Sequence, residues 1–376
     1  MRPNMTTTKQ PSTYLIGVRC SRSSVVIHAA RNLSTSALAA LRPRFLATSV
    51  LIATMALVAL VSDGSWGRVR PVGRAGANAL AVAAAQSYEP HTGQPAVVKQ
   101  VASDLYFFYD YDGSNSVFLV TDAGVLVIDT REHPRAGQDL IARIRKVTDK
   151  PIKWVINSHF HGDHTYGNAA FQAAGATFVT QQETARIMKL VQPKEMARRQ
   201  DYFKEHNYDP NEVKLILPDV TFDTQMSIYL GGREIRLMYF GPGQQPGDTF
   251  VLFPHDRALF TPGAFTSHSM PNMAFTTSVD NWVKLLDKVA ARKDYDVILP
   301  AHGDMAHRED VRELQSMLAD EYATVKAAAA KGTTLEQAQQ TLTFPQYKDW
   351  RNYSRLKSEI QNLYELIQTG KRSYFE

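Results

Sequence analysis

Three histidines and one aspartate fall within six consecutive positions, directly after a strand-like run at 153–157. They are His159, His161, Asp163 and His164. Alternate side chains share one side of an extended segment, so His159 and His161 can converge on one metal ion, while Gly162 lets the backbone turn. Asp163 and His164 are adjacent and diverge, which suits a second coordination position. Imidazole and carboxylate groups bind zinc at about 2.0 to 2.2 Å, so the motif predicts a metal centre at a strand end.

Short strand-like and helical runs alternate through residues 101–304, where we expect the folded domain to begin near Val101. Strands are predicted at 105–109, 116–121, 125–129, 153–157, 176–180, 225–230, 234–240, 249–253, 258–261 and 297–299, and helices at 136–147, 166–174 and 280–291. The runs form two similar halves, which indicates a layered α/β sandwich with α+β-type layering. A charged helical stretch at 182–206 is either a flap over the site or a surface insertion.

The first hundred residues have a different composition. Residues 45–61 form a run of 17 uncharged, mostly apolar residues after Arg42 and Arg44. This pattern predicts an export signal or an uncleaved N-terminal membrane anchor within residues 1–62, and both place the rest of the chain in the periplasm or outside the cell. A misassigned start followed by meaningless leader sequence is the alternative. Residues 63–100 are rich in Gly, Ala, Pro and Arg and are predicted to be a linker.

The net charge of +5 is unevenly distributed. Residues 1–85 carry ten basic side chains against one acid, so the remainder of the chain is net −4. An acidic remainder without a basic stripe argues against nucleic-acid binding, which depends on neutralising phosphates. The only cysteine, Cys20, lies in the leader, so any metal in the exported part must be held by His, Asp, Glu or amide oxygen.

The remaining residues, 305–376, are predicted to be a C-terminal helical extension. Helices are expected at 308–331, 335–342 and 353–368, and the last has Leu356, Ile360, Leu363 and Ile367 on one stripe. Such a stripe packs either on the same chain or on a second copy, and the oligomeric state is not determined by it.

The pattern His-x-His-x-Asp-His after a strand resembles the metallo-β-lactamase superfamily, and the similarity covers roughly Asp104 to His302. The resemblance implies an αββα sandwich with a mono- or dinuclear zinc site at one edge, in a family of hydrolases. The family's early Asp at a strand end matches Asp129. Its last His, in a Pro-x-His-Gly context, matches His302 in Pro300-Ala301-His302-Gly303.

Two positions depart from the family pattern. Gln244, in the segment Gly241–Asp248, occupies the place of the third imidazole of the first metal site. Gly263 or Ala264, depending on the alignment, occupies the place of the metal-bridging Asp. Either alignment removes the bridging carboxylate.

These departures predict one tightly bound zinc ion rather than two. Two dications ~3.7 Å apart repel by about 18 kcal/mol at an effective dielectric of ~20, and Asp163 is the one anionic ligand left to offset this repulsion. Asp163, His164 and His302 form the favoured ligand set. The other set is His159 and His161 with the amide oxygen of Gln244.

The predicted function is an exported metal-dependent hydrolase that acts on an ester-, thioester- or amide-type small molecule. Metal-activated water is the nucleophile, and Asp163, His159 and His161 are the candidate catalytic residues, with either unmetallated imidazole as general base. The alternative is a metal-poor, catalytically retired protein that binds a ligand or partner. A lone loop histidine such as His268 is usually solvated, and its minor alternative role is to replace a lost ligand. Asp304 is likewise a minor candidate for orienting the His302 imidazole.

Overall fold

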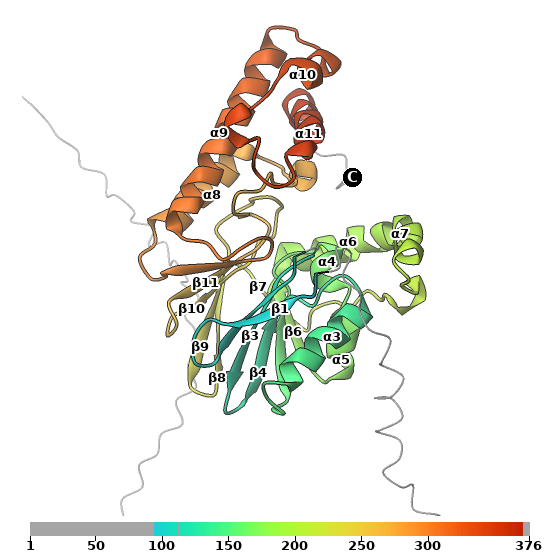
Figure 1. The fold of residues 1–376 in the computed structure, drawn as a ribbon, viewed down its shortest axis with the longest axis vertical. Coiled ribbons are helices and arrows are strands. Elements are labelled where there is room, and N and C mark those ends of the chain that lie inside the picture. Colours follow the sequence, from blue (N-terminus) through green and yellow to red (C-terminus); the bar gives the residue numbers. More distant parts are fainter. Residues whose placement is uncertain (1–93, 112, 371–376) are drawn as a thin grey trace, which may run out of the picture. The chain divides into compact units, whose positions relative to one another are not determined.

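The computed structural model describes residues 94–111 and 113–370, and its strands form two sheets (Figure 1). The first sheet contains, in chain order, β1 (Val97–Gln100), β2 (Leu105–Tyr109), β3 (Ser116–Thr121), β4 (Gly124–Ile128), β5 (Ile152–Ile156), β6 (Thr177–Gln181) and β7 (Val220–Phe222). Neighbours from β1 to β4 are antiparallel, and neighbours from β4 to β7 are parallel. Helices therefore follow β4, β5 and β6, because parallel neighbours need a crossover connection.

The second sheet has the order β12 (Val297–Pro300), β11 (Ala258–Thr261), β10 (Phe250–Phe253), β9 (Arg233–Met238) and β8 (Gln225–Leu230). Its strands are antiparallel except for the parallel pair of β11 and β12. The helix α8 (Val279–Ala291) connects that pair.

The other helices are α3 (Pro134–Arg145), α4 (Gly162–Thr165), α5 (Asn168–Ala173), α6 (Gln182–Arg198), α7 (Gln200–Glu205), α9 (Arg308–Ala330), α10 (Leu335–Thr341) and α11 (Leu356–Thr369). Short 3-10 turns lie at η1 (Pro210–Glu212), η2 (Met273–Phe275), η3 (Pro345–Tyr347) and η4 (Tyr353–Arg355). Within residues 94–111 and 113–370, no helix is both long and apolar enough to cross a membrane.

Alternation along the strands builds the layers. In β2, Leu105 and Phe107 face a core between the two sheets, where they join Val251 of β10. Phe108, one residue further along, faces the opposite side and packs with Leu140 of α3. Because successive side chains of a strand point to opposite faces, each sheet is covered by the other sheet on one face and by helices on the other. The predicted αββα sandwich is confirmed.

The C-terminal helices pack on the outer face of the second sheet. Val311 and Leu314 of α9 belong to the same buried cluster as Trp282 of α8 and Ile360 of α11. The apolar stripe predicted for the last helix thus contacts the same chain. Figure 1 shows α9 running alongside α8, with α10 and α11 against α9.

Three details differ from the sequence expectations. β1 lies inside the predicted linker 63–100, so regular structure begins before Val101. The three-residue strand β7 was not predicted, because so short a run has no readable period. The helix expected at 166–174 is shorter, because α5 covers Asn168–Ala173 and a separate short helix, α4 (Gly162–Thr165), precedes it. Gly167 lies between the two helices, where a Cβ would be 1.8 Å from the Thr130 carbonyl oxygen. The predicted export run at 45–61 lies outside the described residues.

Candidate metal centre

Asp129 organises the centre from the end of β4. Its backbone has a φ of 60°, a left-handed conformation that Asp tolerates better than most residues. The parallel pairing of β4 with β5 brings Ser158 next to it. Asp129 Oδ1 accepts a hydrogen bond from the Ser158 backbone N–H (2.7 Å), and Oδ2 accepts one from Ser158 Oγ (2.6 Å). The Nδ1 of His164 lies 2.8 Å from the same Oδ2.

These contacts set which nitrogen of two histidines carries the proton. His164 Nδ1 faces a carboxylate and must donate, which leaves the Nε2 of a neutral ring as an acceptor. His159 Nδ1 lies 2.8 Å from Ser158 Oγ, whose proton is already donated to Asp129, so Nδ1 donates there as well. Both rings thus present an Nε2 lone pair, the form in which imidazole binds a metal.

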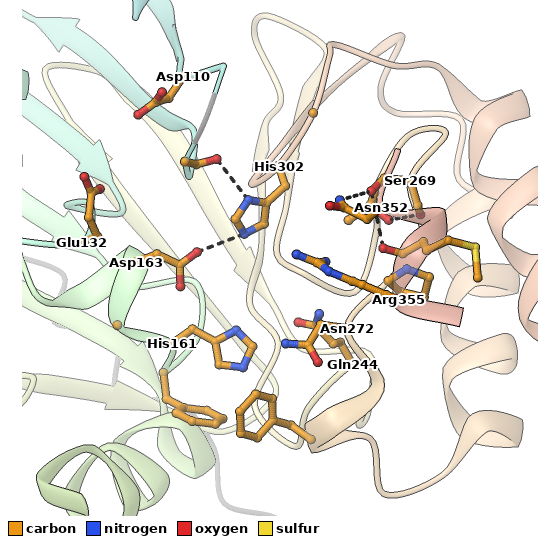
Figure 2. Close-up of a pocket in the computed structure, with 18 of the residues that line it drawn as sticks. Asp110, Glu132, His161, Asp163, Gln244, Ser269, Asn272, His302, Asn352 and Arg355 are labelled. Atoms are coloured by element: carbon orange, nitrogen blue, oxygen red, sulfur yellow. Dashed lines mark hydrogen bonds and ion pairs between the residues drawn. The ribbon is translucent and has the colours of Figure 1, made fainter. Parts of the chain in front are cut away.

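His302 reaches the same point from the end of β12. Its Nδ1 lies 3.2 Å from the Gly113 carbonyl oxygen, which can only accept, so its Nε2 is also an acceptor in the neutral ring. That Nε2 lies 3.0 Å from His164 Nε2 and 3.2 Å from Asp163 Oδ2. Figure 2 shows the contact between His302 and Asp163, with His161 beside them in the pocket.

Three acceptor atoms therefore meet at one point, since His164 Nε2 is also 3.2 Å from Asp163 Oδ2. They repel one another unless a cation lies among them. Burial opposes charging of His164, but the Asp163 and Asp129 carboxylates raise its pKa to about 10. Burial would raise the pKa of Asp163, but the His164 and His302 rings hold it well below its usual range. The cluster thus attracts a proton or a metal ion, and its one carboxylate and two imidazoles fit zinc.

The second predicted ligand set is also buried together. Among the described residues, His159 Nε2, His161 Nε2 and Gln244 Oε1 are buried and have no hydrogen-bond partner. The His159 and His161 rings are 4.7 Å apart between centroids. Burial lowers the pKa of His161 to about 3, so this ring is neutral at physiological pH.

Gly263 adjoins this second set and settles the open alignment. A Cβ at Gly263 would lie 2.1 Å from Gln244 Oε1, whereas Ala264 is fully buried in the core beside Trp282. Position 263 is therefore the one that faces the centre. Any side chain there would collide with Gln244 as it stands.

A cavity of about 640 Å³ opens above both sets, large enough for a small-molecule ligand. His161, Asp163, Gln244 and His302 line it. The predicted charged stretch at 182–206 forms part of the wall through Gln192, Glu195 and Arg199. Gln192 Nε2 donates to the Phe160 carbonyl oxygen at 2.6 Å, which ties α6 to the histidine motif. The stretch thus lines one wall of the cavity.

Two minor candidates for the site pair with other groups instead. His268 is exposed and pairs with Glu313 at 2.9 Å on the surface, so it does not replace a lost ligand. Asp304 pairs with Arg351 at 2.8 Å and makes no bond to His302, whose Nδ1 contacts Gly113 instead.

The sequence motif missed several groups of the site. Asp129 was recognised as a family landmark but without a role, although its place directly after a strand was a usable signal. The Gly113 carbonyl oxygen belongs to the backbone, so no side chain in the sequence indicates its contact with His302. The pocket residues Arg199 and Arg355 stand in helical stretches whose sequence gives no sign of the cavity.

Comparison with known proteins agrees with this geometry. Residues 109–302 match the family model described as the Metallo-beta-lactamase superfamily. A linear primary-alkylsulfatase from Pseudomonas sp. is 27% identical over 234 residues, which are 54% of this chain and 44% of the relative. A metallo-beta-lactamase type 2 from Elizabethkingia meningoseptica is 21% identical over 241 residues, which are 61% of this chain and 88% of the relative.

A solved structure shares the fold. An inverting sec-alkylsulfatase from Pseudomonas sp. superposes with a TM-score of 0.59 at 19% identity, over 72% of this chain and 50% of that one. The chain thus spans about half the length of the alkylsulfatases it matches. With the family match covering more than half of its residues, the chain belongs to the metallo-β-lactamase superfamily.

Proposed function

We propose that this protein is a metal-dependent hydrolase that holds one zinc ion tightly through Asp163, His164 and His302 and cleaves an ester-, thioester- or amide-type bond of a small molecule. The observation that carries the proposal is the meeting of three acceptor atoms within 3.0 to 3.2 Å of one another beside the cavity. Asp129 and Gly113 orient the two imidazoles from behind, as expected of a built ligand set.

The other set supports one ion rather than two. The set consists of three neutral metal ligands, His159, His161 and Gln244. Gly263 supplies no carboxylate to bridge two ions. The space that a bridging side chain would need is taken by Gln244 Oε1. Nothing in this set offsets the repulsion of about 18 kcal/mol expected between neighbouring dications at an effective dielectric of ~20.

The residues have separate roles in this proposal. A zinc ion, which Asp163, His164 and His302 would hold, would lower the pKa of a water molecule to about 7 and polarise the substrate oxygen. His161 lines the cavity and its Nε2 has no partner among the described residues, so it is placed to accept a proton there. His159 is fully buried and tied to Ser158, which makes it the weaker candidate base. The rings of Phe160 and Phe275 meet edge to face with their centroids 5.2 Å apart, and they give the cavity an apolar side.

Metal content and hydrolysis together test the proposal. We expect the purified full-length chain to retain about one zinc per chain after dialysis, measured by plasma mass spectrometry. Asp163→Asn and His302→Gln should lose it, whereas the control His268→Gln should keep it because that imidazole lies on the surface. Turnover of a panel of nitrophenyl esters, thioesters, amides and sulfate esters should stop with chelator and return with zinc. Two tightly held ions, or none, would contradict the proposed centre.

The second candidate function is a binding protein that has lost catalytic activity. It is favoured by Gln244 and Gly263, which stand where the family has a metal-binding histidine and a bridging aspartate. Gln244→His separates the two readings. If this substitution creates activity where the natural chain has none, the natural chain is a binding module. If the natural chain already hydrolyses a substrate in a zinc-dependent way, the binding-module reading fails.

We also propose export to the periplasm or beyond, with residues 45–61 acting as a signal or a membrane anchor. The support is the uncharged run after Arg42 and Arg44. Cell fractionation and N-terminal sequencing of the isolated protein test it, and a cytoplasmic protein with its leader intact would contradict it.

A further inference from the structure

One wall of the cavity comes from the C-terminal extension. The segment just before α11 is joined to the loop after β11 by two backbone hydrogen bonds, Arg351 N–H to the His268 oxygen and Met270 N–H to the Arg351 oxygen, both 2.9 Å. Asn352 Nδ2 also donates to Ser269 Oγ at 2.9 Å. These bonds hold the start of η4 and α11 at the mouth of the site, where Figure 2 shows Asn352 and Ser269 beside Arg355.

The two arginines of this segment differ in their partners. Arg351 is neutralised by Asp304 at 2.8 Å. Arg355 lines the cavity, and no carboxylate in residues 94–111 or 113–370 forms an ion pair with it. Figure 2 shows its side chain extending into the pocket, toward His302 and Gln244. A guanidinium that faces a cavity without an acidic partner is available to an anion from solution.

The acidic side chains of the cavity are already engaged. Asp110 forms an ion pair with the buried Arg131, and Glu132 lies 3.7 Å from the same guanidinium. Glu195 pairs with Arg198 at 3.0 Å. The remaining acid, Asp163, belongs to the metal cluster. Besides Arg355, the cavity holds a second arginine without an ion pair among the described residues, Arg199, which stacks over Tyr202 at 5.7 Å. The four carboxylates that line the cavity are thus all engaged, whereas Arg199 and Arg355 form no ion pair among the described residues.

We propose that Arg355 binds an anionic head group of the substrate, a sulfate or a carboxylate, beside the metal centre. The planar guanidinium fork matches the paired oxygens of either group. The apolar part of the same substrate packs on Phe160 and Phe275. The proposal rests on the proposed hydrolase function and narrows its substrate class to amphiphilic anions.

Binding of unreactive probes tests this without turnover. Octyl sulfonate, octanoate and octanol are titrated calorimetrically into the full-length chain, below their aggregation concentrations, both with zinc and after chelation. The sulfonate has a carbon–sulfur bond that is not hydrolysed. We expect at least one of the two anions to bind more tightly than octanol. The anion with the higher affinity identifies the head group as sulfate-like or carboxylate-like.

Variants locate the charge responsible. Arg355→Gln should weaken anion binding about tenfold to a hundredfold, and Arg355→Lys should restore part of it. The matched control is Arg312→Gln, an exposed arginine of α9 that lies outside this cavity, and it should bind like the natural chain. Thermal unfolding of each variant shows whether the fold is intact.

Two results would overturn the proposal. The first is equal affinity for octanol and for both anions. The second is anion binding that is unchanged in Arg355→Gln and disappears only when the metal is chelated, because the metal rather than Arg355 would then bind the anion. Either result could stand beside zinc-dependent ester hydrolysis, which would leave the proposed function in place. Conversely, Arg355-dependent anion binding in a chain without any hydrolytic activity would contradict the proposed function and leave the anion site standing.

Discussion

Replacing Asp129 with asparagine should weaken zinc binding even though Asp129 does not belong to the proposed ligand set. Three donors converge on its two oxygens: Ser158 N–H on Oδ1, and Ser158 Oγ and His164 Nδ1 on Oδ2. An asparagine that keeps its oxygen toward Ser158 N–H turns its NH₂ group toward the other two. His164 must then move its proton from Nδ1 to Nε2, which points a hydrogen at Asp163 and His302 instead of a lone pair.

The size of the effect follows from these bonds. Changes in groups that orient a metal ligand typically cost about tenfold to a hundredfold in metal affinity, or about 1.4 to 2.7 kcal/mol. The loss of a charged acceptor places Asp129→Asn toward the upper end, since hydrogen bonds to charged groups contribute about 1.5 to 3 kcal/mol.

The assay is a competitive titration of zinc against a chromophoric chelator of known affinity. The matched control is Asp139→Asn, a partly exposed carboxylate paired with Arg143 on α3, which should leave zinc affinity within about twofold because it does not touch the ligands. Thermal unfolding with chelator present separates loss of fold from loss of affinity. A folded Asp129→Asn protein that binds zinc as tightly as the natural chain would refute the reasoning about proton placement.

Two further substitutions test packing and charge elsewhere. Gly263→Ala places a Cβ 2.1 Å from Gln244 Oε1, so we expect a loss of about 1 to 3 kcal/mol in unfolding free energy, measured by denaturant titration; an unchanged midpoint would show that Gln244 moves freely. Glu321 of α9 is fully buried near Glu359 of α11. Its burial is the main cause, and the Glu359 charge the lesser cause, that raise its pKa from 4.5 to about 8. A raised acid pKa means that the folded state holds the proton more tightly, so stability falls as pH rises from about 4.5 to 8, by up to about 5 kcal/mol. Glu321→Gln should therefore unfold at a higher temperature than the natural chain at pH 9 and at a similar temperature at pH 5. The control Glu309→Gln, on the exposed side of α9, should unfold like the natural chain at both pH values. Parallel pH profiles of unfolding temperature for the natural chain and Glu321→Gln would contradict the cost of charging the buried Glu321.

The metal centre was predictable only where its residues are close in sequence. The motif from His159 to His164 is local and spans the loop after β5 and the short helix α4, so its side chains stay near one another. His302 follows His164 by 138 positions, and no local pattern pairs the two; the family resemblance supplied that link. The choice between Gly263 and Ala264 needed the coordinates, because it depends on which side of the chain faces Gln244.

The fold was predicted more completely than the cavity for a physical reason. A continuous apolar run, as in Leu105 to Tyr109, indicates a strand that is buried on both faces and can be read directly from the sequence. Arg355 gives no such signal, because its position depends on hydrogen bonds between segments more than 80 positions apart, such as that from Asn352 Nδ2 to Ser269 Oγ. The short break at Gly167 was likewise invisible until the Thr130 carbonyl was seen to approach it.

The wide spacing of the ligands also matters while the chain is being made. His302 is translated 138 residues after His164, and ribosomes add about 5 to 20 residues per second, so roughly 7 to 28 seconds separate the two. Throughout that interval a nascent chain carries the clustered imidazoles of the early motif without their distant partner. The complete centre, with Arg355 at its rim, exists only after residue 355 has been translated.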